Sequence, residues 1–183
     1  MRTLTDQLAR YAAYHRDRRN IATHLIGIPM IVAALAVLLS RPASNLGALA
    51  FDVSPAWLLF GAATVYYLLL DVPLGLMMAV VSAVCIVFGH WLAAAPLSVW
   101  LGSGLGLFVV GWIFQFVGHA AYEHRKPAFV DDVIGLLIGP LFVLAEVLFS
   151  FGFRPVLRDA IERAAGPTRG SGNPRHGEPR RQR

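Results

Sequence analysis

A run of 51 residues, 72–122, contains no Asp, Glu, Lys or Arg, and it restricts the possible folds more than any other feature of the chain. A helix needs roughly 20 apolar residues to cross a bilayer, so this run is long enough for two spans. Three more stretches are nearly free of charge: 21–40, 53–70 and 133–153, the last interrupted by Glu146. Only 15% of the residues are charged, against about 25% in ordinary soluble domains. We therefore predict an all-α, polytopic membrane helical bundle.

Charged residues and prolines divide the apolar stretches into about four full transmembrane spans, which we place at 21–39, 55–70, 74–93 and 97–122. Gly139-Pro140 interrupts the last stretch, which favours two half-helices in a re-entrant segment. Residues 3–15 have the pattern of an amphipathic helix at the membrane surface. Asn20 has the residue type of an N-cap and is expected to open the first span.

The distribution of Lys and Arg predicts the topology. They precede the first span, follow the fourth and crowd the C-terminus, whereas the opposite side carries only Arg41. By the positive-inside rule the N-terminus and the end of the fourth span face the cytoplasm. Residues 1–165 form one membrane-embedded catalytic domain, and 166–183 are expected to be a disordered basic tail. Since topology explains the net charge of +5, we predict membrane lipid and no nucleic acid as a partner.

Three polar residues at steps of four end the uncharged run: Gln115, His119 and Glu123. On a helix this spacing places them on one face. A buried polar group costs several kcal/mol unless it is paired or bound to something. We infer a bound metal ion, completed by His15 and His24, which the topology places at the same interface. A structural network of interhelical hydrogen bonds is the alternative, and the pattern alone leaves both open.

Neutral imidazole and carboxylate groups suit iron(II), zinc or manganese, and two or more histidines with one carboxylate are typical of non-haem iron(II) oxygenases. Glu123 fits either a ligand or the hydrogen-bond partner of a ligating His119. Asn20, Gln115 and Tyr14 are candidates for orienting the ligands from behind.

Other polar residues are weaker candidates for the metal. His124 lies off the predicted stripe, and His90 lies near the opposite end of its span. For His90 a hydrogen bond between helices is the expected role. Glu146 fits a helix-pairing group or a proton relay better than a ligand. The single Cys85 excludes an internal disulfide and a site built from cysteines.

Two sequence blocks resemble the 2-hydroxy fatty acid dioxygenases, a family of endoplasmic-reticulum membrane proteins with bacterial relatives. The first block is Tyr14-His15 with Asn20, His24, Gly27 and Pro29, and the second is GWIFQFVGH (111–119) followed by Glu123, Pro127, Ala128 and Asp131. A glutamate, Glu146, also stands where the family has one. The likeness covers about residues 4–160 and leaves out the tail.

The resemblance implies an Fe(II)-dependent dioxygenase that uses O2 to convert long-chain 2-hydroxy fatty acids into fatty acids one carbon shorter. It transfers the iron-binding role to His15, His24 and His119. Glu123 matches the motif, and its role as a metal-binding and, with His119, catalytic residue is our inference. The basic tail and the lack of an endoplasmic-reticulum retention signal favour a bacterial member in the inner membrane.

Arg19, Arg125 and Lys126 are expected near the cytoplasmic interface and could meet the substrate carboxylate. Two other function classes remain as alternatives. One is a non-enzymatic membrane scaffold or transporter whose polar stripe joins helices, and the other is a metal-dependent lipid hydrolase. The sequence defines neither the chain-length preference nor the oligomeric state.

Overall fold

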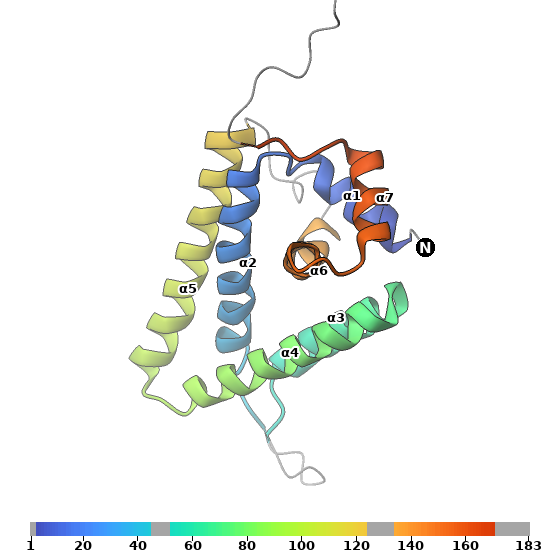
Figure 1. The fold of residues 1–183 in the computed structure, drawn as a ribbon. Coiled ribbons are helices and arrows are strands. Elements are labelled where there is room, and N and C mark those ends of the chain that lie inside the picture. The colour runs from blue at the N-terminus through green and yellow to red at the C-terminus, as the bar shows by residue number, and fades with distance from the viewer. Residues whose placement is uncertain (1–2, 45–51, 124–133, 171–183) are drawn as a thin grey trace, which may run out of the picture.

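The computed structural model describes residues 3–44, 52–123 and 134–170. Over these ranges every regular element is a helix, which confirms the all-α class (Figure 1). The elements are α1 (Leu4–Ala13), α2 (Arg18–Leu38), α3 (Pro55–Leu70), α4 (Val72–Ala93), α5 (Leu97–Gly118), the π-helical turn η1 (His119–Glu123), α6 (Ile134–Ser150) and α7 (Pro155–Ala165).

Three helices are long and apolar enough to cross a membrane: α2, α4, and α5 extended by η1. The α6–α7 pair passes the same test together but is bent by 119°, which gives three to four candidate spans among the described residues. The second predicted span, 55–70, is the helix α3, but its 16 residues reach only about 24 Å, short of the roughly 30 Å hydrocarbon core. Residues 55–70 are therefore not counted as a full span.

Helices α2 and α5 lie side by side and form the scaffold of the site (Figure 1). Gly27 on α2 faces Gly111 on α5, and a Cβ on Gly27 would lie 2.7 Å from the Gly111 carbonyl oxygen. A Cβ on Gly111 would lie 2.9 Å from the Gly27 carbonyl oxygen. Only glycine allows this close approach of two backbones. The contact sets the register that brings the start of α2 beside the end of α5.

The predicted break at Gly139-Pro140 is wrong, because α6 continues through Pro140. A proline inside a membrane helix is tolerated when neighbouring groups compensate for its missing backbone hydrogen bond. The carbonyl that Pro140 leaves without its helical donor is that of Leu136, four residues earlier. The Tyr67 hydroxyl, from α3, donates to the neighbouring Leu137 carbonyl at 2.7 Å and so joins α3 to α6 beside the proline. The sharp bend comes later, between α6 and α7, where Gly152 and Arg154 have positive φ angles of 79° and 56°. The position of the bend is thus corrected, and a re-entrant arrangement of this region stays a prediction.

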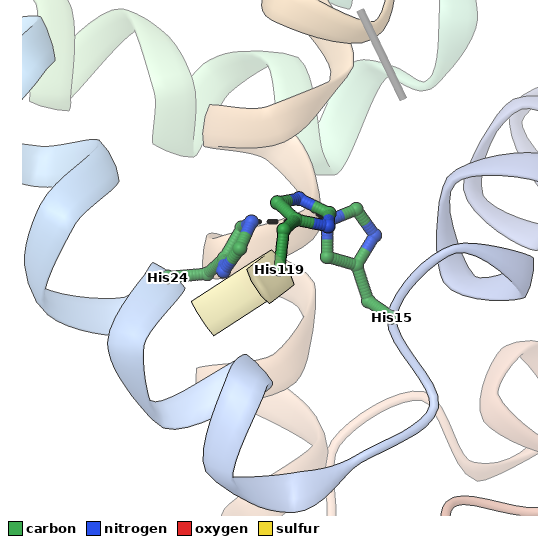
Figure 2. Close-up of side chains that lie close together, drawn as sticks. All are labelled: His15, His24 and His119. Atoms are coloured by element: carbon green, nitrogen blue, oxygen red, sulfur yellow. Dashed lines mark hydrogen bonds between the residues drawn. The ribbon is translucent and has the colours of Figure 1, made fainter. Parts of the chain in front are cut away.

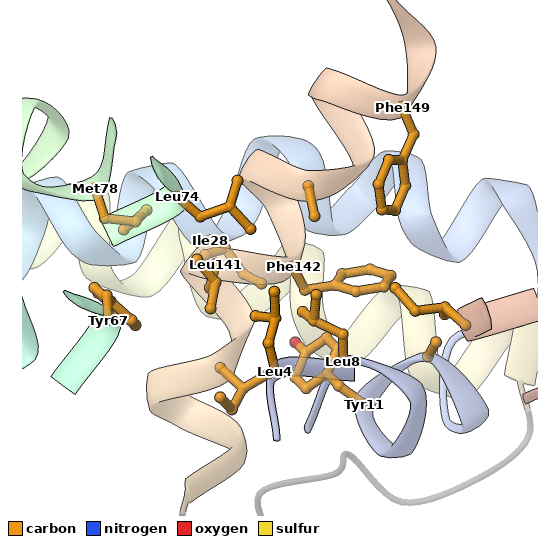
Figure 3. Packing of buried hydrophobic residues seen from close by; sticks show 14 residues of the cluster. Leu4, Leu8, Tyr11, Ile28, Tyr67, Leu74, Met78, Leu141, Phe142 and Phe149 are labelled. Atoms are coloured by element: carbon orange, nitrogen blue, oxygen red, sulfur yellow. The ribbon is translucent and has the colours of Figure 1, made fainter. Parts of the chain in front are cut away.

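Helix α1 forms as predicted, but protein covers its apolar side. Leu8 and Ala12 are fully buried, and α1 packs against α6 and α7. Figure 3 shows Leu4, Leu8 and Tyr11 beside Phe142 of α6. The amphipathic pattern of α1 therefore reflects contact with this core.

Candidate metal centre

Three imidazoles from distant parts of the chain meet in the interior (Figure 2). His15 comes from the loop between α1 and α2, His24 from α2, and His119 from the first position of η1. Each is at most 3% exposed, and one nitrogen from each ring lies within 4.8 Å of the others. The three residues could together hold a metal ion.

Backbone hydrogen bonds determine where two of these rings carry their protons. His15 Nδ1 lies 2.7 Å from the Tyr11 carbonyl oxygen, and His24 Nδ1 lies 2.9 Å from the Asn20 carbonyl oxygen. A carbonyl oxygen only accepts, so each Nδ1 donates and each neutral ring presents an unprotonated Nε2. Yet His15 Nε2 lies 3.0 Å from His24 Nε2 and 3.2 Å from His119 Nε2 (dashed lines in Figure 2). Between His15 and His24, two lone pairs face each other with no proton to share.

A cation between the rings resolves this conflict. Protonation of one ring would also remove the conflict, but it is unfavourable here. Burial and the neighbouring His24 ring hold the pKa of His15 well below its ordinary value of 6.5. Two nitrogens bound to one ion at about 2.1 Å and about 90–100° would lie roughly 3.0–3.2 Å apart. The separations from His15 match this spacing. The residues present therefore fit a metal ion.

Two local features hold His15 and His119 in place. The Tyr11 ring stacks on His15 with centroids 4.2 Å apart and planes 10° from parallel. His119 opens the π-helical turn, an irregularity that is frequent at functional sites.

Glu123 does not join the imidazoles, although we predicted it as a ligand and catalytic group. Its Oε1 accepts from the backbone amides of Arg16 at 2.5 Å and Asp17 at 2.7 Å, and from Asn20 Nδ2 at 3.4 Å. Its Oε2 accepts from Arg169 Nη2 at 2.9 Å. The carboxylate thus holds the loop that carries His15.

The first residues of the predicted tail also contact this loop. The Arg16 guanidinium donates to the Gly166 carbonyl and to Thr168 Oγ1. The backbones of Arg16 and Arg18 also pair with that of Arg169. Sequence reasoning missed these contacts, because nothing in the pattern separates Arg169 from the other arginines nearby. The rest of the tail, 171–183, lies outside the described residues.

Asn20, Tyr14 and Gln115, which we expected to orient the metal ligands, differ from one another in their contacts. The N-cap of α2 is Asp17, whose Oδ1 accepts from the Arg19 amide at 2.8 Å, so the N-cap prediction for Asn20 is wrong. Asn20 lies within the helix, fully buried, and holds His24 through its backbone carbonyl. Tyr14 packs against the hydrophobic core, whereas Gln115 faces the cavity described below.

The remaining candidates lie away from the imidazoles. Arg19 pairs with Asp17 at 3.1 Å and does not line that cavity. His90 Nε2 lies 3.1 Å from Ser54 Oγ at the other end of the bundle, a contact between helices as expected. Glu146 is half-buried and lines a separate pocket with Arg16 and Arg158. The predicted candidates His124, Arg125 and Lys126 lie outside the described residues.

A cavity of about 630 Å³ extends from the imidazoles into the bundle. Its polar end is formed by the three histidines, Tyr11 and Gln115. Its walls are mainly apolar side chains of α2 to α6, among them Ile31, Leu35, Phe60, Met78, Phe108 and Trp112. The size is within the usual range for small-molecule sites, and the lining, polar at the imidazoles and apolar elsewhere, suits a ligand with a polar head and an apolar tail.

Comparison with known proteins agrees with the resemblance of the two motif blocks. Over residues 1–151 the sequence matches the family described as Mpo1-like, 2-hydroxy-palmitic acid dioxygenase Mpo1-like. A curated relative, the 2-hydroxy-palmitic acid dioxygenase MPO1 of Saccharomyces cerevisiae (strain ATCC 204508 / S288c), is 32% identical over 160 residues, 87% of each chain. No solved structure matches. The chain therefore belongs to the Mpo1-like family, described as 2-hydroxy-palmitic acid dioxygenases.

Proposed function

We propose that the chain is an Fe(II)-dependent dioxygenase that uses O2 to convert long-chain 2-hydroxy fatty acids into fatty acids one carbon shorter. The observation that carries this proposal is the group of three buried imidazoles at the polar end of an apolar cavity. The names of the family and of the yeast relative supply the substrate class. Histidine nitrogens with further positions open for substrate and O2 suit non-haem iron.

His15, His24 and His119 would hold the ion through Nε2. An Fe(II) ion bound there would supply the redox chemistry with O2 that the oxidation at C2 and the loss of C1 require. The chain itself fixes the rings, because the Nδ1 hydrogen bonds of His15 and His24 set their tautomer and orientation. The apolar walls hold the acyl tail, and the burial of all three rings keeps bulk water away from the reacting carbons.

We also propose where the reaction takes place. The imidazoles would lie toward the cytoplasmic face, and the excess of Lys and Arg near the start of α2 and at the C-terminus supports this orientation. The membrane in question is the inner membrane of a bacterium. Membrane lipid surrounds the bundle, and the acyl substrate enters the cavity from it.

The test is oxygen consumption by the purified protein with 2-hydroxypalmitate. Uptake should stop with a ferrous chelator and return with Fe(II), and metal analysis should find near-stoichiometric iron. His24→Ala and His119→Ala should each abolish uptake and iron binding. The matched control His90→Ala changes a histidine at the other end of the bundle and should retain both.

Three outcomes would contradict the proposal. Full turnover by His119→Ala would exclude the imidazole site. Protein without metal would favour a scaffold or transporter. Product formation without O2 would favour a metal-dependent lipid hydrolase.

A further inference from the structure

Gln115 is a buried polar side chain that the metal site does not use. It is 6% exposed and lines the cavity of the three imidazoles. Its Nε2 is buried and has no hydrogen-bond partner within the described part of the chain. Buried amide donors are nearly always satisfied, so an unpartnered one at a cavity wall indicates a hydrogen bond to a bound ligand.

The surroundings of Gln115 place its amide just inside the imidazoles. Gln115 precedes His119 by one turn of α5, on the side of the apolar walls. Trp112 and Phe108 lie about one and two turns before Gln115 in the same helix and line those walls. Gly27, three residues after His24, faces it from α2, where a Cβ would lie 2.5 Å from Gln115 Nε2. The glycine thus leaves the space that the amide occupies. The amide therefore lies at the polar end of the cavity, between the imidazoles and the part that suits an acyl tail.

A role in joining helices would require a partner on α2. Residues of α2 lie close to the amide, yet none accepts a hydrogen bond from Nε2. Nor does Nε2 bond to any of the three imidazoles, so Gln115 does not orient a ring through this atom. Among the residues that the structure describes, none accepts from this donor, which leaves it available to a ligand in the cavity.

We propose that Gln115 Nε2 donates a hydrogen bond to the 2-hydroxyl oxygen of the substrate and so sets the preference for 2-hydroxy acids over unsubstituted ones. This rests on the proposed function. With the carboxylate at the imidazoles and the tail along the apolar walls, C2 is the first carbon on the tail side of the head. Its hydroxyl is the acceptor nearest to an amide placed one turn inside His119.

The experiment compares the binding of 2-hydroxypalmitate and palmitate to the iron-loaded, full-length protein without O2. Wild type should bind 2-hydroxypalmitate more tightly. Gln115→Leu should weaken that ligand about tenfold and change palmitate binding by less than about twofold, as expected for one lost hydrogen bond. The matched control is Gln7→Leu, which also removes a buried glutamine, one that donates to the Tyr66 hydroxyl at 3.1 Å and lies off the cavity. It should keep the wild-type preference.

The outcomes separate this inference from the proposed function. If Gln115→Leu keeps the wild-type preference, the hydroxyl assignment is overturned and the dioxygenase is untouched. Equal weakening of both ligands, or loss of iron from Gln115→Leu alone, overturns it as well, since the amide would then support the carboxylate or the metal. If wild type itself does not distinguish the two acids, the proposed function fails together with this inference.

Discussion

At the scale of single residues, the three histidines and Glu123 differ in what they contact. The imidazole nitrogens converge on one point, whereas the carboxylate accepts from two backbone amides of the loop that carries His15. Glu123 therefore acts on the site through that loop. Loss of such a supporting contact typically lowers metal affinity or activity about 10–100-fold.

This predicts the behaviour of Glu123→Ala. Iron affinity should fall about 10–100-fold, because the loop amides lose their acceptor and His15 is held less firmly. At saturating Fe(II), the X-ray absorption spectrum of the bound iron should match that of wild type. A changed coordination shell would show that Glu123 is a ligand after all.

The sequence predicted the histidines but not the partner of Glu123, for a physical reason. His15, His24 and His119 are residue types with few reasons to lie in apolar surroundings, so their identity and position already indicate a site. The acceptor role of Glu123 depends on backbone amides of Arg16 and Asp17, a donor that every residue type except proline has. The spacing of side chains in the sequence therefore does not predict these backbone contacts.

At the scale of elements, the α2–α5 contact predicts opposite effects for two glycines of α5. A Cβ on Gly111 would meet the Gly27 carbonyl oxygen at 2.9 Å and Ile31 Cγ1 at 2.7 Å, whereas one on Gly106 meets nothing within 4 Å. Gly111→Ala should lower the free energy of unfolding by about 1–3 kcal/mol through overpacking. Gly106→Ala should leave it unchanged or raise it. Denaturation of both variants in detergent measures the difference, and equal stabilities would contradict the close packing.

Helix positions followed from the sequence where charge or proline marks both ends, as for 55–70. For the span predicted at 97–122, Pro96 marked the start, but the α-helix ends at Gly118 and the chain continues as the π-helical turn to Glu123. The prediction was wrong at Pro140, where local chemistry favours a break. Beside the proline, α6 is joined to α3 by the hydroxyl of Tyr67, 70 residues earlier than Leu137, and only the packed structure shows that contact. We expected the apolar side of α1 to face the membrane surface, whereas it packs against other helices. The periodicity of apolar residues does not distinguish burial in a protein core from contact with lipid.

At the scale of the whole molecule, the C-terminal segment 166–170 contacts Glu123 and the chain between α1 and α2, at Arg16 and Arg18. This predicts a sharp difference between two shortened chains. Ending the chain after Gly170 keeps every described contact. Ending it after Ala165 removes the Arg169–Glu123 ion pair and the hydrogen bonds of the Arg16 guanidinium to Gly166 and Thr168. The shorter form should bind iron more weakly and unfold at a lower temperature. Equal iron retention by the two forms would show that the segment is dispensable.

The distance in sequence between two of the imidazoles has a further consequence. An ion bound by His15 and His119 would link two residues that are 104 positions apart. It would thereby close a loop of the chain that contains α2 to α5. In the chain-entropy treatment of cross-links, a ring of about 100 residues restricts the unfolded chain by about 4.7 kcal/mol. The metal ion would then also act as a reversible cross-link that stabilises the fold. Iron starvation would therefore reduce the amount of folded protein as well as its catalytic rate.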